Sequence, residues 1–313
     1  MGKMVNGEWT TEWYKADQDG RFVRPDTVFR DRIGPDCLDG GLHLYVSYAC
    51  PWANRVLIVR AWHDLEEMLP ISVVHPYMGD EGWCFDASRV GATQDKVLAK
   101  NCLHQVYSAG APTYTGRVTV PVLWNLSENR IVNNESREII EMLDEHGAKR
   151  SGKPPLWPAS LRTEIDAMID ANYETVNNAV YRAGFATSQQ AYEQAATALF
   201  KRLDELNEHL ADRRFLCGQH FTTADVCLFT TLMRFDTVYV GHFKCNLRRL
   251  VDFEHLWAYT RDVFQMNLGE PHLYLQHSKE HYYRSHLTIN PTGLVPVGPA
   301  LDFDAPHDRL RFS

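Results

Sequence analysis

The chain has 313 residues, 44% of them hydrophobic and 23% charged, and its formal net charge is −8 at pH 7. These values are typical of a globular protein with a sizeable core, long enough for two domains. The negative charge argues against nucleic acid or an anionic membrane surface as a partner, and no apolar run is long enough for a transmembrane helix. No secretory signal is evident, and the seven scattered cysteines favour a reducing compartment over a disulfide framework. We therefore expect a cytoplasmic protein.

The first part of the chain predicts an N-terminal extension followed by an α/β domain. Residues 1–38 are rich in Trp, Asp and Gly without a period, which favours an extended arm. Residues 39–150 contain four strand patterns and two helix patterns, with strands at 42–47, 71–75, 118–124 and 130–132 and helices at 52–67 and 135–146. The order β-α-β-β-β-α is that of a thioredoxin-like fold. The polar stretch 77–116 has no clear period, and we expect a functional insertion there.

The second part of the chain predicts an all-α domain over residues 151–276. A Gly- and Pro-containing linker at 152–155 precedes it. Apolar residues then recur at three- and four-residue spacing in four segments, 160–180, 188–211, 223–240 and 249–266. Thr222 and Asp225 have the spacing of a capping box at a helix start. Residues 277–313 lose this periodicity, and we expect a C-terminal coil extension.

Cys50 is the first candidate catalytic residue. It follows a strand and directly precedes Pro51, which is tolerated in the first turn of a helix because its missing N–H would be unpaired there. A sulfur at a helix N-terminus lies near unpaired backbone N–H groups and the positive end of the helix dipole, and both favour the thiolate. The fourth position of the motif is Ala53, so no cysteine within the motif can resolve a mixed disulfide formed on Cys50. This pattern indicates monothiol redox chemistry with a small thiol as the second reactant.

Two further motifs predict a binding site for a peptide-like thiol near Cys50. Val120 and Pro121 lie within a strand pattern, where proline is disfavoured unless the hydrogen-bonded ladder is interrupted. In a thioredoxin-like domain this position holds a cis-proline opposite the cysteine, so we expect the Val120–Pro121 bond to be cis. Glu135 and Ser136 open the next helix, where a carboxylate, a hydroxyl and free N–H groups can bind both charges of a γ-glutamyl group.

Together with these motifs, the rest of the sequence resembles the Xi class of glutathione transferases, the glutathionyl-hydroquinone reductases. The resemblance covers nearly the whole chain, and the residues that carry it are 50–53, 82–83, 117–124, 134–136, 177–186, 234–236 and Tyr239. It implies a thioredoxin-like domain followed by an all-helical domain. It also implies a homodimer formed mainly through the helical domain.

The resemblance implies a reduction in two steps with glutathione as co-substrate. Cys50 attacks the sulfur of a glutathionyl-hydroquinone and expels the hydroquinone, and a second glutathione then releases oxidised glutathione. Glutathione is expected to be bound by Trp83, Arg117, Val118, Thr119, Val120, Glu135 and Ser136. Three tyrosines are expected to border the hydroquinone pocket, Tyr181 as the general acid or base, with Tyr239 and Tyr282; the adjacent Tyr283 is the alternative to Tyr282.

Two other functions use the same residues differently. An Omega-like transferase would reduce dehydroascorbate or deglutathionylate other substrates with Cys50 and a different second pocket. A transferase-like binding module without turnover would need no reactive thiol. Histidines recur at spacings of four and five near the C-terminus (His272, His277, His281 and His286), but no carboxylate or cysteine pattern accompanies them, and we expect no metal.

Overall fold

The computed structural model describes residues 2–12, 14–34, 38–268 and 274–312, and these residues form two compact units. The first unit comprises Met1–Trp13, Arg24–Lys153 and Gly269–Leu287, and the second comprises Tyr14–Val23, Pro154–Leu268 and Thr288–Ser313. Within the described ranges, no helix combines the length and apolar character needed to cross a membrane. Cys37 and His272 lie outside the described residues.

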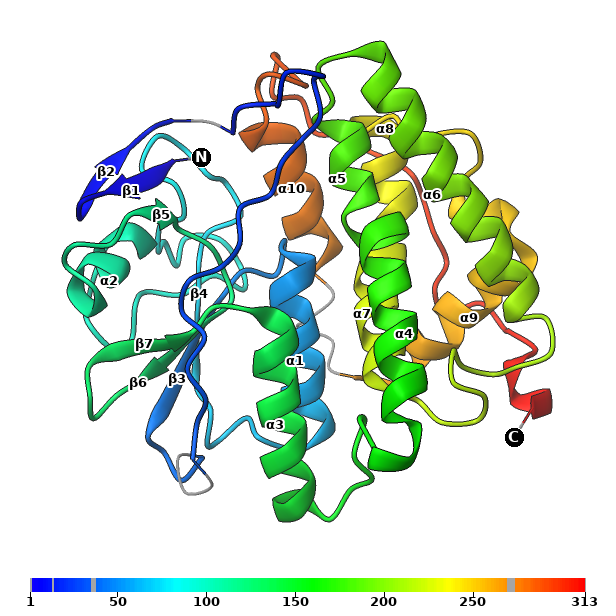
Figure 1. The fold of residues 1–313 in the computed structure, drawn as a ribbon, viewed down its shortest axis with the longest axis horizontal. Coiled ribbons are helices and arrows are strands. Elements are labelled where there is room, and N and C mark those ends of the chain that lie inside the picture. The colour runs from blue at the N-terminus through cyan, green and yellow to red at the C-terminus, as the bar shows by residue number, and fades with distance from the viewer. Residues whose placement is uncertain (1, 13, 35–37, 269–273, 313) are drawn as a thin grey trace. The chain divides into compact units, whose positions relative to one another are not determined.

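The first unit contains a four-stranded mixed sheet (Figure 1). Its strands are β3 (Leu42–Val46), β4 (Ile71–Val73), β6 (Val122–Asn125) and β7 (Arg130–Asn133), in the order β4-β3-β6-β7. β3 is parallel to β4 and antiparallel to β6, and β6 is antiparallel to β7. All five residues of the central strand β3 are buried, as expected for a strand covered on both faces. The predicted thioredoxin-like order is confirmed.

Two helices pack side by side along this sheet, α1 (Pro51–Trp62) and α3 (Ser136–Ser151). α1 ends five residues earlier than predicted because Asp64 adopts a left-handed conformation with φ 53°. The amide of Leu65 then donates to the carbonyl of Arg60 at 2.9 Å, which closes the helix end. α3 in turn runs five residues beyond the predicted end and stops at Gly152, whose φ of 69° suits a glycine C-cap.

The N-terminal extension contains regular structure that the sequence analysis missed. β1 (Lys3–Val5) and β2 (Glu8–Thr10) form a hairpin, and β5 (Gly116–Arg117) adds to β1, which gives a three-stranded sheet in the order β2-β1-β5. The turn is Asn6-Gly7, with φ values of 50° and 85°. Asn-Gly is a strong hairpin signal because both positions need positive φ, so the sequence did contain this information.

Two further predictions of irregular structure were incomplete. The 77–116 stretch contains α2 (Leu103–Gly110), and the predicted C-terminal coil begins with α10 (Leu275–Ser285), which belongs to the first unit. The buried residues of α10 include His277, Lys279, Glu280 and His281. Because these buried side chains are polar, the apolar spacing that identifies helices is absent there.

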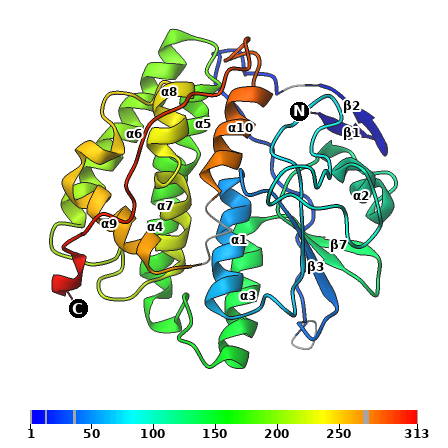
Figure 2. The same cartoon turned by 180° about the vertical axis from the view of Figure 1, so that it is seen from behind.

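The second unit is built from helices, as predicted (Figure 2). They are η1 (Ala159–Leu161), α4 (Arg162–Asn172), α5 (Ala179–Gly184), α6 (Gln189–His209), α7 (Thr223–Leu232), α8 (Val240–His242), η4 (Leu250–Asp252), α9 (Glu254–Gln265) and η6 (Arg309–Phe312). α4 packs along α7, and α5 packs on α6. Two single π-helical turns interrupt the regular pattern, η2 (Tyr173–Asn177) and η3 (Phe235–Tyr239). The predicted capping box at Thr222 and Asp225 is present.

Candidate active site

Cys50 lies at the junction that the sequence predicted, as the N-cap residue of α1. Its extended backbone (φ −83°, ψ 119°) places the sulfur beside the first turn of the helix, with Pro51 at the first helical position. The carbonyl of Cys50 accepts the amide of Asn54 at 3.0 Å and so starts the helical hydrogen-bond series. Cys50 is partly exposed, whereas Cys217, Cys227 and Cys245 are buried. Among the free cysteines of the described ranges, Cys50 therefore has the most accessible sulfur.

The Val120–Pro121 peptide bond is cis, as predicted. The Sγ atom of Cys50 lies 3.5 Å from the carbonyl oxygen of Val120, to which the thiol donates. Val120 is itself almost fully buried, so its backbone position is fixed by packing. The cysteine and the residue before the cis-proline are therefore adjacent in space, although 70 residues separate them.

The start of α3 carries a carboxylate and a hydroxyl, as predicted. Glu135 is the N-cap, and its side chain accepts the amide of Arg137 at 3.2 Å and the hydroxyl of Thr27 at 3.1 Å. The Ser136 hydroxyl lies 3.5 Å from Oε1 of this carboxylate, the oxygen that also accepts the Arg137 amide. This arrangement presents a negative group beside a helix N-terminus, the combination that can bind both an ammonium and a carboxylate.

Trp83 is buried in the first unit and stacks on His281 of α10. The ring centroids are 4.5 Å apart and the planes differ by 24°. His281 is itself fixed because its Nδ1 donates to the carbonyl of Pro76 at 2.9 Å. The predicted C-terminal coil therefore supplies, as part of α10, a residue that positions a candidate glutathione-binding side chain.

The segment Arg117–Thr119 is hydrogen-bonded to the N-terminal residues and to α2. The Arg117 guanidinium donates to the carbonyls of Gly2 at 3.3 Å and Glu12 at 2.5 Å. The phenol of Tyr107 donates to the carbonyl of Thr119 at 2.9 Å. Val118 between them is buried. These contacts hold the strand that leads to the cis-proline, and they give Arg117 a structural role that the sequence analysis did not predict.

Tyr282 and Tyr283 differ in burial. Tyr282 is only 2% exposed, whereas Tyr283 is partly exposed. The Tyr282 ring makes edge contacts with His281 and His286, at centroid distances of 5.2 Å and 5.4 Å. The histidines of α10 thus act as packing and hydrogen-bonding residues. His277 likewise donates to the carbonyl of Val90 at 2.7 Å, and burial lowers its pKa, which favours the neutral ring.

The two other candidate tyrosines lie together in the second unit. The rings of Tyr181 and Tyr239 are 6.2 Å apart between centroids. Tyr239 is fully buried and stacks on Phe243 at 5.6 Å, and Tyr181 is partly exposed. Tyr239 is the last residue of the π turn η3, and Tyr181 follows the π turn η2 by four residues. Single π turns occur frequently at functional sites, and the sequence gave no sign of them.

A disulfide joins Cys84 and Cys102 within the predicted insertion. The sequence analysis did not pair these residues, because a separation of 18 residues carries no local signal. The pair does not amount to a disulfide framework, since Cys50, Cys217, Cys227 and Cys245 are free. In the described ranges one group has metal-ligand spacing, Glu81, Cys102 and His104. The Cys102 sulfur of this group is bonded to Cys84, so it offers no thiolate ligand.

Comparisons with known proteins agree with this architecture. The family model "Glutathione S-transferase, N-terminal domain" matches residues 49–146, and "Glutathione S-transferase, C-terminal domain" matches residues 189–262. The chain is 47% identical to the glutathionyl-hydroquinone reductase PcpF of Sphingobium chlorophenolicum over 304 residues, which cover 96% of this chain and 97% of PcpF. It is 44% identical over 330 residues to the glutathionyl-hydroquinone reductase YqjG of Escherichia coli, with both chains covered completely.

Solved structures give the same result. The Xi class transferase from Natrialba magadii superposes with a TM-score of 0.94 at 43% identity, covering 99% of this chain and 98% of its own. The glutathione-bound structure of YqjG superposes with a TM-score of 0.88, covering 99% and 100%. Similarity of this extent includes the N-terminal hairpin, the disulfide-containing segment and α10. The chain therefore belongs to the glutathione S-transferase family, in its Xi class together with the glutathionyl-hydroquinone reductases.

Proposed function

We propose that this protein reduces glutathionyl-hydroquinones to hydroquinones at the expense of glutathione. The Cys50 thiolate attacks the sulfur of the substrate and forms a disulfide with its glutathionyl group. The bond from that sulfur to the aromatic carbon breaks, and the carbon keeps the electron pair and takes a proton. A second glutathione thiolate then attacks the glutathionyl sulfur, which releases oxidised glutathione and regenerates Cys50.

The position of the Cys50 sulfur supports this proposal most directly. It is partly exposed at the N-terminus of α1 and lies 3.5 Å from the Val120 carbonyl, next to the cis-proline. In such a site the Val120 backbone can pair with the peptide-like glutathione, and we assign its γ-glutamyl end to Glu135 and Ser136 at the start of α3. Trp83 and Arg117–Val118–Thr119 complete the set of residues that we propose for glutathione binding.

We propose Tyr181 as the proton donor to the departing aromatic carbon, with Tyr239 and Tyr282 bordering the hydroquinone. A phenol can donate a hydrogen bond to a quinol oxygen or a proton to carbon at neutral pH, because its ordinary pKa is near 10. Of the two candidate tyrosines in the second unit, Tyr181 is the more exposed residue. Because Tyr239 is fully buried, we propose that it lines the pocket and does not donate the proton.

The test is release of hydroquinone and oxidised glutathione from a glutathionyl-hydroquinone supplied with excess glutathione. We expect wild-type protein and a Cys217→Ser control to release both products, because Cys217 is buried and its pKa is raised by burial to about 12. Cys50→Ala should release neither. Turnover by Cys50→Ala would refute the mechanism.

The same preparations distinguish the two other functions. An Omega-like enzyme would leave the glutathionyl-hydroquinone unchanged but reduce dehydroascorbate in a Cys50-dependent manner. A binding module would be retained on immobilised glutathione without turning over either compound. We place the protein in the cytoplasm, since each turnover consumes one free glutathione and releases one oxidised glutathione, and a reducing pool must replace what is consumed. We also propose a homodimer, which light scattering after size-exclusion chromatography would test.

A further inference from the structure

Cys84 directly follows Trp83 in the chain and forms a disulfide with Cys102. Cys84 and Cys102 form an isolated antiparallel bridge. Backbone hydrogen bonds flank it on both sides, from the Leu103 amide to the Trp83 carbonyl at 2.8 Å and from the Phe85 amide to the Asn101 carbonyl at 2.7 Å. The disulfide therefore joins the segment that carries Trp83 to the start of α2.

The two sulfurs of this disulfide lie in different environments. Cys84 is partly exposed, whereas Cys102 is 7% exposed. Cys102 is the N-cap of α2, its carbonyl oxygen accepts the Gln105 amide at 3.1 Å, and its own amide donates to the Gln105 side chain at 3.2 Å. A thiolate at Cys102 would lie beside the first turn of α2, at the positive end of the helix dipole. An attacking thiol therefore reaches Cys84 more easily, and Cys102 is the better leaving group.

The imidazole of His104 lies near the leaving sulfur. The ligating atoms of His104, Glu81 and Cys102 all lie within 4.8 Å of one another, and His104 Nε2 is 3.0 Å from the Glu81 carboxylate. The imidazole of His104 stacks on Trp9, with ring centroids 4.9 Å apart and planes differing by 18°. This stacking fixes the ring, and an imidazole so placed can protonate the Cys102 thiolate as it leaves.

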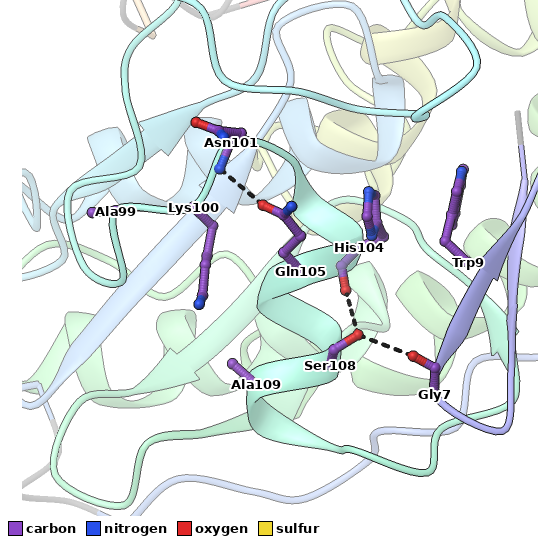
Figure 3. Close-up of a pocket in the computed structure, with 9 residues that line it drawn as sticks. All are labelled: Gly7, Trp9, Ala99, Lys100, Asn101, His104, Gln105, Ser108 and Ala109. Carbon is purple, nitrogen blue, oxygen red and sulfur yellow. Dashed lines mark hydrogen bonds between the residues drawn. The ribbon is translucent and has the colours of Figure 1, made fainter.

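A polar pocket lies beside α2 and is lined in part by His104, Asn101 and Gln105, which are near Cys102 in the chain (Figure 3). Its volume is about 640 Å³, and it is lined by Gly7, Trp9, Ala99, Lys100, Asn101, His104, Gln105, Ser108 and Ala109. The Lys100 ammonium gives it a positive group, and Asn101 and Gln105 give it amides. These groups match the carboxylates and peptide bonds of a small anionic peptide thiol such as glutathione.

From these observations we propose that the Cys84–Cys102 disulfide is a second site of thiol–disulfide exchange with glutathione, separate from Cys50. A glutathione thiolate attacks the Cys84 sulfur, forming a Cys84–glutathione disulfide while Cys102 leaves as a thiolate and takes a proton. A second glutathione thiolate attacks the glutathionyl sulfur, which gives a Cys84 thiol and one molecule of oxidised glutathione. The protein disulfide gains two electrons, and two glutathione thiols lose one each. The reverse sequence, with oxidised glutathione as oxidant, closes the disulfide again.

This inference rests on the proposed function only for the presence of glutathione and oxidised glutathione as co-substrate and product. Turnover at Cys50 produces the oxidant that closes the disulfide. The fraction of closed disulfide then follows the ratio of reduced to oxidised glutathione, and it determines whether the segment that carries Trp83 is covalently joined to α2. Because Cys50 takes no part in the exchange, the two proposals can fail separately.

The test uses the full-length Cys50→Ser variant, incubated in buffers that range from mainly oxidised to mainly reduced glutathione. Free thiols are alkylated, the remaining disulfides are reduced and labelled with a second reagent, and peptide mass spectrometry reports each cysteine. We expect the reduced fraction of Cys84 and Cys102 to rise together with the glutathione ratio in the native protein. The buried Cys217 is the internal control and should stay unlabelled. A pair that stays oxidised in every buffer, and opens only in denaturant, would show a purely structural disulfide and overturn the proposal.

Two single variants test which sulfur is attacked. With oxidised glutathione, Cys102→Ser should acquire a glutathione adduct on Cys84, whereas Cys84→Ser should leave Cys102 without one. An adduct on Cys102 alone, or equal adducts on both, would overturn the assignment. His104→Gln should slow reduction of the disulfide by about a hundredfold, as expected on loss of a general acid. An unchanged rate would remove His104 from the step.

Discussion

Asp225 offers a quantitative test of how the second unit is stabilised. Its carboxylate is fully buried and accepts four hydrogen bonds, from the amides of Leu216 and Thr222 at 2.9 Å each, the Thr222 hydroxyl at 2.9 Å and the Tyr259 phenol at 3.0 Å. In Asp225→Ala the two amides and the phenol lose their acceptor. At about 1 kcal/mol for each such group, the free energy of unfolding should fall by about 3 kcal/mol near neutral pH.

The same residue predicts the pH dependence of that loss. Burial raises the pKa of Asp225 from 3.8 to about 6, despite the four hydrogen bonds that oppose the rise. Between these two values the folded protein binds a proton that the unfolded chain does not. The part of Asp225's contribution to stability that comes from this proton is therefore complete below the lower value and is lost as the pH rises through about 6, whereas the hydrogen-bond part remains. Since one pKa unit corresponds to about 1.4 kcal/mol, Asp225→Ala should cost about 1.4 kcal/mol more at about pH 5 than at about pH 7.5.

The assay is urea unfolding of the wild type and the variant at both pH values, followed by far-ultraviolet circular dichroism. The matched control is Asp252→Ala, which removes a carboxylate from a similar capping position. Asp252 accepts the Arg249 amide at 3.1 Å, but it is exposed, and water replaces it as the acceptor. A loss at Asp225 that is equal at both pH values, or larger at the higher one, would refute the reasoning.

Three further predictions concern the thiols, the proton donor and helix packing. An alkylating reagent near neutral pH should label Cys50 and leave Cys217 intact, because burial raises the Cys217 pKa to about 12; mass spectrometry detects the label, and equal labelling contradicts the assignment. Tyr181→Phe should lower kcat with little change in the KM for glutathione, and steady-state kinetics with unchanged kcat would exclude Tyr181 as the donor. Gly184→Ala should destabilise the protein by about 1–3 kcal/mol, because a Cβ there would lie 2.1 Å from the Phe243 ring; an unaltered thermal midpoint would contradict this.

The parts of the site that the sequence predicted correctly have local causes. Pro51 fixes the start of α1 beside Cys50, and Glu135 caps α3, since each signal lies within one turn of the residue that it positions. The cis bond at Val120 was inferred because its strand lies within the thioredoxin-like order of elements. The hairpin at Asn6-Gly7 has an equally local signal, but residues 1–38 as a whole show no period, and this favoured an extended arm.

The parts that the sequence did not reveal depend on tertiary contacts. α10 buries His277 and His281, whose ring N–H groups are satisfied by the carbonyls of Val90 and Pro76. A helix that is buried through such contacts shows no apolar stripe. The pairing of Cys84 with Cys102 depends likewise on the path of the insertion, which no pattern of residue types determines.

Each unit consists of segments that lie far apart in the chain, and this affects how the protein folds while it is being synthesised. The first unit needs residues from its N-terminal hairpin up to Leu287, and the second needs residues from Tyr14 up to the C-terminal end. A ribosome elongates the chain vectorially, so the β1–β2 hairpin can form early but pairs with β5 only once Arg117 has been made. α10 emerges only after Pro154–Leu268 of the second unit. The first unit is therefore completed only after much of the second has been made, and we expect the two units to fold in overlapping periods rather than one after the other.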